Sequence, residues 1–166
     1  MAIRIFITGG TFDKTYDILR GQLYFEDSQV PDMLRLGRNS VEVRVRTLMM
    51  IDSLEMTDED RDMIVRNCRA AAEDHILITH GTDTMVKTAR LLAQEVPDKT
   101  IVITGAMIPY RFGSSDGFFN LGSALAFAQI LPKGTYIVMN GRYFDAHNVV
   151  KNTKTGMFEE LSFVDP

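Results

Sequence analysis

The sequence contains no tryptophan and only one cysteine, Cys68, among its 166 residues. A single cysteine excludes an internal disulfide and any metal site built from several thiolates, and it fits a reducing compartment. The first apolar run, Ile3 to Ile7, is too short for the hydrophobic region of a signal peptide, and no cleavage site follows it. We therefore predict a cytoplasmic protein.

Clusters of basic residues are also missing. The chain has 18 Lys and Arg against 22 Asp and Glu, a net charge of −4, and no basic stripe that would neutralise a run of phosphates. The apolar share of 45% and the charged share of 24% are typical of a soluble globular protein rather than a disordered or membrane-spanning one. We predict one domain over residues 1–166, with neither nucleic acid nor a membrane as partner.

Five short apolar runs rich in β-branched residues are typical of strands. They are Ala2 to Thr8, Val41 to Met50, His75 to Thr79, Thr100 to Thr104 and Thr135 to Asn140. Segments with helical spacing lie between them: Ser28 to Leu36, a segment from Thr57 to about Asp74, Asp83 to Val96, and Asp116 to Leu131. This alternation predicts a single α/β domain with three layers, a doubly wound and mostly parallel sheet of the flavodoxin or Rossmann kind.

Polar residues gather where four of the predicted strands end. They are Thr8 to Thr11, Asp52 and Ser53, Thr79 to Asp83, and Gly105 to Met107. In open sheets of this kind, ligands bind beyond the carboxyl ends of the strands. We therefore expect these four segments to converge on one candidate site.

Each segment also has a purely structural interpretation. Gly9 and Gly10 would let the backbone approach a ligand, but they would equally make a tight turn between a strand and a helix. Asp83 could merely cap the helix that follows it. His80 is interpreted as a hydrogen-bonded packing residue, because one histidine without a partner is not a metal site. Lys151, taken alone, reads as a solvated surface charge.

Four motifs together have a recognisable order: TGGT at Thr8 to Thr11, HGTDT at His80 to Thr84, GAM at Gly105 to Met107, and DGFFNL at Asp116 to Leu121. In order and spacing they resemble the N-terminal domain of the bacterial L-asparaginase and glutaminase family, over nearly the whole chain. The resemblance implies an amidohydrolase that converts L-asparagine to L-aspartate and ammonia with a threonine nucleophile, without cofactor or metal.

The resemblance implies catalytic roles for Thr11, Tyr16, Thr82, Asp83 and Lys151. Thr11 matches the family's nucleophile, and Tyr16 matches a tyrosine that assists it from a mobile lid, here Phe12 to Leu23. The other three match a Thr-Lys-Asp set. Threonine is a weak nucleophile at neutral pH, so a nearby base must take its proton, and a desolvated lysine is one candidate. Which threonine attacks, and which group is the base, stays open.

The residues implied in substrate binding are Gly10, Ser53, Gly81, Thr82, Asp83 and Ala106. Asp83 matches the aspartate that grips the substrate's α-amino group, and Ser53 matches the serine that contacts its α-carboxylate. The carbonyl of Ala106 would border the side-chain amide. Backbone amides of Thr11 and Thr82 would supply the oxyanion hole.

Two features depart from the family's pattern. Leu54 stands where many members carry a glutamine that helps to hold the amino group of the substrate. The chain resembles short members that consist of the first domain only, whereas typical members have a second α/β domain. An alternative function is therefore an amino-acid-binding or regulatory module with little or no turnover. A nucleotide-binding domain would be supported by fold analogy alone.

Without a second domain, one side of the site would be open to water. We therefore predict a symmetric homo-oligomer, a dimer or tetramer, that covers the site. The polar segment Arg142 to Pro166 carries an apolar set that one small domain would not bury alone. This set is Tyr143, Phe144, Val149, Val150, Met157, Phe158, Leu161 and Phe163.

Overall fold

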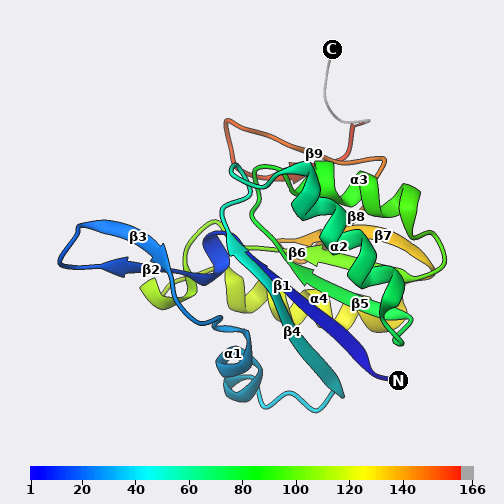
Figure 1. The fold of residues 1–166 in the computed structure, drawn as a ribbon, viewed down its shortest axis with the longest axis horizontal. Coiled ribbons are helices and arrows are strands. Elements are labelled where there is room, and N and C mark those ends of the chain that lie inside the picture. Colours follow the sequence, from blue (N-terminus) through cyan, green and yellow to red (C-terminus); the bar gives the residue numbers. More distant parts are fainter. Residues whose placement is uncertain (162–166) are drawn as a thin grey trace.

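The computed structural model of the chain, which describes residues 1–161, has a six-stranded sheet at its centre (Figure 1). The strands follow the order β4-β1-β5-β6-β7-β8. Their bounds are Ile3–Gly9 (β1), Val43–Ile51 (β4), His75–Thr79 (β5), Thr100–Thr104 (β6), Gly134–Met139 (β7) and Arg142–Asp145 (β8). All neighbours pair in parallel except β7 and β8. The five predicted strands and the mostly parallel sheet are confirmed.

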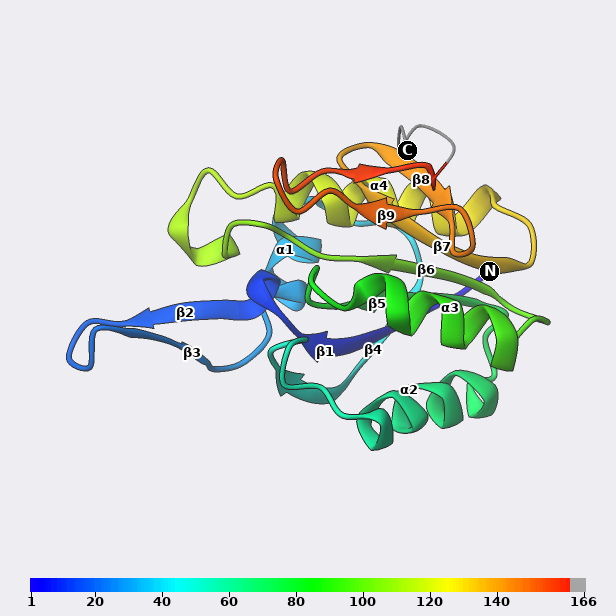
Figure 2. The same cartoon turned by 90° about the horizontal axis from the view of Figure 1, so that it is seen from above.

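Helices cover both faces of the sheet, as Figure 2 shows from above. Their bounds are Val30–Leu36 (α1), Asp58–Ala70 (α2), Met85–Glu95 (α3) and Gly117–Ile130 (α4). Helices α2 and α3 pack on one face, and α1 and α4 pack on the other. The predicted three-layer α/β architecture is therefore confirmed.

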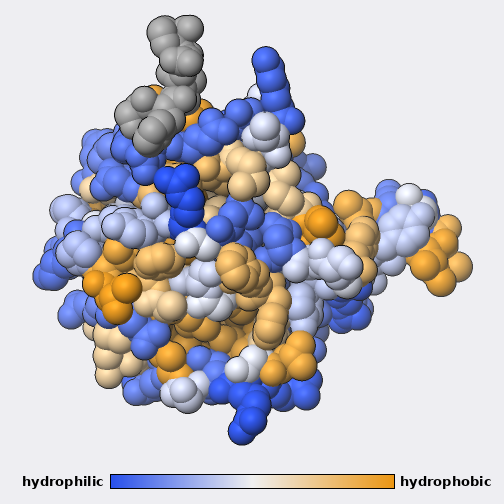
Figure 3. All heavy atoms as spheres, turned by 180° about the vertical axis from the view of Figure 1, so that it is seen from behind, coloured by the Kyte–Doolittle hydropathy of each residue, from blue (hydrophilic) through white to orange (hydrophobic). Residues whose placement is uncertain are grey.

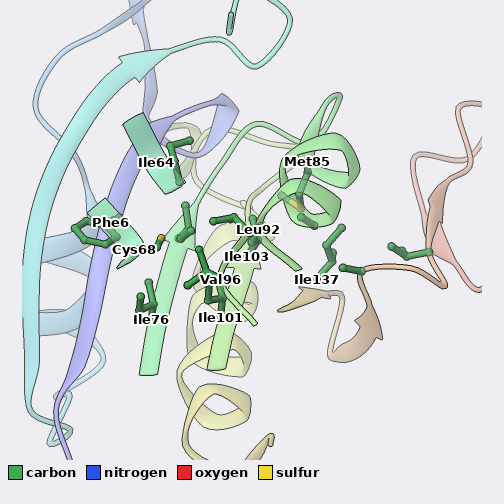
Figure 4. Close-up of a cluster of buried hydrophobic side chains, with 14 of the residues drawn as sticks. Phe6, Ile64, Cys68, Ile76, Met85, Leu92, Val96, Ile101, Ile103 and Ile137 are labelled. Atoms are coloured by element: carbon green, nitrogen blue, oxygen red, sulfur yellow. The ribbon is translucent and has the colours of Figure 1, made fainter. Parts of the chain in front are cut away.

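Alternation along the central strands produces two separate cores, because successive strand side chains point to opposite faces. On β5, Ile76 and Ile78 join the cluster under α2 and α3, which also contains Cys68 (Figure 4), whereas Leu77 joins the cluster under α4. Cys68 is fully buried, and burial raises the pKa of its thiol to about 12. It is a packing residue in a reduced state.

Two helix ends differ from the sequence prediction. Helix α2 begins with the predicted capping box of Thr57 and Asp60 but ends at Ala70, short of the expected Asp74. Ala72 is exposed, so it does not continue the apolar stripe. Asp116 precedes α4 as expected, but its carboxylate makes no capping bond to the helix. It accepts hydrogen bonds from a neighbouring loop instead, as described below.

Strand β8 was not predicted; its residues were assigned to the polar tail. It forms because Asn140 and Gly141 both adopt positive φ, 54° and 79°, and turn the chain back in a two-residue hairpin. Asn-Gly is the sequence typical of that turn. The hairpin places Phe144 against the core with 3% exposure.

The tail is buried more fully than expected. Val149 and Phe158 join the same core cluster as Phe144, while Tyr143, Met157 and Leu161 stay 50%, 46% and 42% exposed. Phe163 lies outside the described residues. The domain thus buries part of the apolar set alone, and the remaining surface is smaller than the sequence indicated.

Two short hairpins stand apart from the central sheet. Strands β2 (Lys14–Asp17) and β3 (Gln22–Phe25) form an arm that projects beyond the body of the molecule (Figures 1 and 2). Strands β9 (Val150–Lys151) and β10 (Phe158–Glu159) form the second hairpin. In the described part of the chain, no helix has the length and apolar character needed to cross a membrane.

Candidate active site

Two glycines, Gly10 after β1 and Gly81 after β5, bring the ends of these strands into contact. A Cβ on Gly10 would lie 2.4 Å from the backbone nitrogen of Gly81, so a side chain at Gly10 would force these two turns apart, whereas a Cβ on Gly81 would meet Ser53 at 2.6 Å. Gly10 also has φ 81° and ψ −179°, a conformation adopted almost only by glycine. Because Thr11 follows Gly10 and Thr82 follows Gly81, this contact makes the two predicted nucleophile candidates neighbours.

Lys151 joins the third strand end from the other end of the sequence. Its Nζ atom is 2.9 Å from Oγ1 of Thr82 and 2.7 Å from Oδ1 of Asp83. The Lys151 side chain is 13% exposed and that of Asp83 is 49% exposed, so the ammonium group is largely covered while the carboxylate faces solvent. The structure therefore assembles the predicted Thr-Lys-Asp set from positions 68 or 69 residues apart.

The hairpin that carries Lys151 is fixed to the domain. Phe158, which pairs with Lys151 across β9 and β10, is 4% exposed in the core. Arg90 of α3 donates a hydrogen bond of 3.3 Å to the carbonyl of Val149. Lys151 is thus held by core packing rather than placed on a free surface, which corrects the interpretation of the residue as a solvated charge.

Thr11 begins a 3-10 turn, η1 (Thr11–Asp13), that leads into the arm. The next side chain, Phe12, is fully buried and anchors this turn to the core under α4. Asp13 is also buried, and burial raises the pKa of its carboxyl against the hydrogen bonds from Gln29 and Ser28, which lower it. Within residues 1–161, the hydroxyl of Thr11 makes no hydrogen bond to another side chain, which leaves it available to a reactant.

The arm carries Tyr16 away from Thr82 and Lys151. Tyr16 pairs with Leu23 across the arm and is 49% exposed. The segment predicted as a lid, Phe12 to Leu23, is therefore a turn followed by most of an extended hairpin. Its end carries Ile18 and Leu19 at 83% and 92% exposure. Figure 3 shows hydrophobic surface at the end of the projecting arm.

An ion pair fastens the base of the arm to the second strand end. Lys14 of β2 contacts the carboxylate of Asp52, which directly precedes Ser53. Burial alone would raise the pKa of Asp52, but the hydrogen bonds from Lys14 and from the Leu54 amide outweigh it and lower the pKa. The arm is thus tied at its base beside the candidate site, and its strand β2 also lies against the 3-10 turn η2 (Tyr110–Phe112).

Ser53 lies beneath the third strand end rather than open to solvent. It is 1% exposed, and its Oγ would meet a Cβ on Gly81 at 2.6 Å. The Thr84 amide donates to this hydroxyl at 3.4 Å. Leu54, which stands where many family members carry a glutamine, is 72% exposed, and its apolar side chain offers no hydrogen bond to the amino group of a substrate.

The fourth strand end is held by two residues of the DGFFNL motif that the sequence did not assign to the site. The Asp116 carboxylate accepts hydrogen bonds from the amides of Met107 and Ile108, each at 3.0 Å. Asn120, fully buried, donates to the Gly105 carbonyl at 2.9 Å and accepts from the Asn140 amide at 2.9 Å. Their spacing of four residues on one helix was the available signal. Ala106, held between these contacts, is 1% exposed.

His80 is a packing residue, as the sequence interpretation has it. It is fully buried, with Nδ1 2.7 Å from the Gly81 carbonyl and Nε2 2.8 Å from Oγ1 of Thr88. Burial is the main cause that lowers its pKa to about 4. No group of three or more His, Cys, Asp or Glu side chains among residues 1–161 is placed to hold a metal ion.

Most of the predicted site residues lie on the turns that follow the strands. A hollow of about 420 Å³ lies elsewhere, between α1 and α4, and contains none of the predicted site residues. A reactant would therefore bind on the rim itself, against the turns that follow β1, β4, β5 and β6.

Comparisons with known proteins agree with this geometry. A family model described as "Asparaginase, N-terminal" matches residues 2–163. L-asparaginase 2 of Bacillus subtilis is 33% identical over 186 aligned residues, which cover 98% of this chain and 48% of that protein. The probable periplasmic L-asparaginase of Haemophilus influenzae is 31% identical and covers 93% of this chain and 47% of that protein.

Solved structures give the same result. The thermostable L-asparaginase from Thermococcus kodakarensis superposes with a TM-score of 0.86 and 28% identity, over 99% of this chain and 52% of that one. A probable cytoplasmic L-asparaginase from Campylobacter jejuni gives a TM-score of 0.82 and 29% identity, over 97% and 53%. This chain spans about half the length of the relatives that it matches.

Proposed function

Because the chain belongs to the asparaginase family, we propose that it hydrolyses the side-chain amide of L-asparagine to L-aspartate and ammonia, with its own side chains and neither cofactor nor metal. The observation that supports this proposal most strongly is the contact of Lys151 with Thr82 and Asp83. A buried lysine against a threonine hydroxyl is an arrangement for moving a proton. A module that only bound an amino acid would have no use for it.

The reaction begins with attack by a threonine hydroxyl on the amide carbon. Thr11 is the proposed nucleophile, and Lys151, once its ammonium group has released a proton to solvent, takes the proton of Thr11 through the hydroxyl of Thr82. The carbonyl oxygen becomes an oxyanion, stabilised by the backbone amides of Thr11 and Thr82. Collapse of this intermediate breaks the carbon–nitrogen bond, and the proton held by Lys151 leaves with the nitrogen as ammonia.

The second half of the reaction hydrolyses the enzyme ester. Water attacks the β-aspartyl ester on Thr11 and gives its proton to Lys151 as it does so. The ester bond then breaks, the proton returns to the oxygen of Thr11, and L-aspartate is released. The same proton route therefore serves both steps, and the lysine ends each cycle as it began.

Substrate recognition is assigned to Asp83 and to the turns around it. Its half-exposed carboxylate is proposed to accept the α-ammonium group of asparagine. Gly10 and Gly81 would bring backbone close to the substrate, the Ala106 carbonyl would border its amide, and the Ser53 turn would receive its α-carboxylate. The Ser53 hydroxyl is covered and the Leu54 amide already donates to Asp52, so this turn would have to shift as the α-carboxylate binds.

Tyr16 requires a movement of the arm. We propose that the arm bends about its base, where Lys14 contacts Asp52, and brings Tyr16 over Thr11 when substrate is bound. Closure would also cover the exposed apolar residues of the arm and exclude water from the reacting atoms.

L-asparagine is expected to react with a kcat/KM about 100-fold higher than that of L-glutamine. The extra methylene moves the scissile carbonyl away from a nucleophile whose position is set by the anchors for the α-amino and α-carboxylate groups. The measurement is ammonia release with each substrate at equal enzyme concentration. Equal or faster turnover of glutamine would reject this preference.

A homo-oligomer, at least a dimer, is proposed to cover the rim. The exposed part of the tail, including Tyr143, Met157 and Leu161, is one apolar surface available for it. Light scattering at micromolar concentration should show a mass of two or more chains, and activity should fall on dilution as the assembly dissociates. A monomer with undiminished activity on dilution would refute the proposal.

The cytoplasm remains the predicted location, and the names of the relatives include both a periplasmic and a cytoplasmic protein.

A further inference from the structure

Arg61 of α2 is a buried cation that the proposed reaction leaves unexplained. Its side chain is 3% exposed, and its closest carboxylate, on Asp58, is 3.6 Å away and itself 79% exposed. The guanidinium donates to two backbone carbonyls at the start of its own helix, at 2.9 and 3.1 Å. It also donates to the hydroxyls of Thr88, at 3.2 Å, and Thr84, at 2.9 Å. Thr88 in turn contacts His80, and Thr84 contacts Ser53, both beside the candidate site.

The first path runs through Thr88 to His80. An arginine can only donate, so the Thr88 hydroxyl must accept from Arg61 and direct its single proton elsewhere. His80 Nε2 lies 2.8 Å from that hydroxyl, much closer than the other available acceptor, the Met56 sulfur at 4.0 Å, so the proton is directed to His80. The imidazole proton must then sit on Nδ1, which donates to the Gly81 carbonyl at 2.7 Å.

The direction of this path matters for the next peptide bond. The carbonyl of Gly81 and the amide N–H of Thr82 belong to one planar trans peptide, so they point in opposite directions. A hydrogen bond that holds the Gly81 oxygen toward His80 therefore aims the Thr82 N–H away from the core, toward the rim. This N–H is one of the two proposed oxyanion donors.

The second path runs through Thr84 to Ser53. The Thr84 hydroxyl accepts from Arg61 and donates to the Ser53 carbonyl at 2.8 Å. The turn after β4 is thereby tied to the turn after β5. Because this turn is proposed to receive the substrate's α-carboxylate, the second path bears on substrate binding rather than on the chemical step.

We propose that Arg61 is a positioning residue, which fixes the proton directions of Thr88 and Thr84 and so orients the Gly81–Thr82 peptide and the Ser53 turn. The expected effects on kcat and KM rest on the proposed function, whereas the position of the proton on the His80 ring does not depend on it. In this proposal Arg61 touches neither substrate nor reacting atoms and reaches the site through these two hydroxyls, while its bonds to the Met56 and Thr57 carbonyls hold the start of α2.

The test separates the two paths with isosteric variants. Thr88→Val should lower kcat about tenfold and change KM less than about twofold, because it loosens the Thr82 N–H, a proposed oxyanion donor. Complete removal of such a donor lowers kcat by a factor on the order of 100 or more. Thr84→Val should raise KM several-fold with a smaller effect on kcat. Arg61→Lys, which keeps the charge but not the forked donors, should show both effects.

Lys99→Met is the matched control. Lys99 is a buried cation, 7% exposed, that directly precedes β6 at the end of the sheet opposite the candidate site. It donates to the carbonyls of Ala71 and Glu73. Its loss should lower the melting temperature and leave kcat and KM of the folded enzyme within about twofold of the parent values. If Lys99→Met reproduced the kinetic changes of Thr88→Val and Thr84→Val, general destabilisation would explain them and the proposal would fail.

Nitrogen NMR of the His80 ring tests the proposal without any activity. At neutral pH the parent protein should show the proton on Nδ1 with Nε2 unprotonated, and Thr88→Val should give a mixture of tautomers. This result with no hydrolysis of asparagine would uphold the positioning of His80 and reject the proposed function alone. A parent ring protonated on Nε2, or an unchanged ring in Thr88→Val, would overturn the role of Arg61.

Discussion

A Lys151→Met variant is expected to hydrolyse L-asparagine at least about 100-fold more slowly than the parent chain, while keeping its fold. Methionine preserves most of the length of the side chain but cannot carry a proton. The contacts of Lys151 with Thr82 and Asp83 would be lost together, so the proposed route for the threonine proton would disappear. The measurement is kcat from ammonia release, alongside circular dichroism to show that the fold persists.

Lys154→Met supplies the comparison for that experiment. Lys154 is an exposed lysine in the turn between β9 and β10, three positions from Lys151, and its side chain makes no ion pair with another described residue. Its replacement should change kcat by less than about twofold, because a solvated surface charge contributes little. A folded Lys151→Met variant with the activity of Lys154→Met would remove Lys151 from the proposed mechanism.

A Gly10→Ala variant is expected to lose on the order of 3 kcal/mol of unfolding free energy. The new Cβ would lie 2.4 and 2.5 Å from the backbone nitrogen and Cα of Gly81, and a backbone cannot yield as a flexible side chain does. The φ of 81° adds strain for any residue with a Cβ. Because the clash would separate Thr11 from Thr82, activity should fall as well. Urea denaturation with the linear extrapolation gives the free energy.

Gly122→Ala tests whether the effect belongs to the site. Gly122 lies inside α4, and a Cβ there would meet nothing within 4 Å. Alanine should therefore stabilise the helix by up to about 1 kcal/mol and leave activity unchanged. If Gly10→Ala were as stable as the parent, the close approach of the two turns would not be a requirement of the fold.

The sequence predicted the central sheet well because its signal is local. Runs such as His75 to Thr79 and Thr100 to Thr104 are continuous and β-branched, and the structure confirms both with the same bounds. Strand β8 was missed because Arg142–Asp145 is only four residues long and buries Phe144 alone, so it has no clear alternation of exposed and buried residues. The Asn140-Gly141 turn was the available clue, since it is typical of a tight hairpin.

The candidate site depends on contacts that spacing alone does not reveal. Nothing local in the sequence indicates that Lys151 reaches Thr82, since the contact depends on how the β9–β10 hairpin packs on the core. Arg61 differs, because its spacing from Ile64 and Cys68 places it on the buried face of α2, but nothing local in the sequence shows that it reaches Thr84 and Thr88. The extended arm was predicted as a lid from resemblance, and Tyr16, which was expected to assist Thr11, lies on strand β2 of this arm and is half exposed.

The most direct measurement of the central claim is ammonia release from L-asparagine by the purified 166-residue chain, compared with a Thr11→Val variant. Valine matches the shape of threonine and removes only the hydroxyl that is proposed to attack. The account predicts steady ammonia release by the parent chain and a loss of at least about 100-fold in the variant. No release by the folded parent chain, or undiminished release by Thr11→Val, would contradict it.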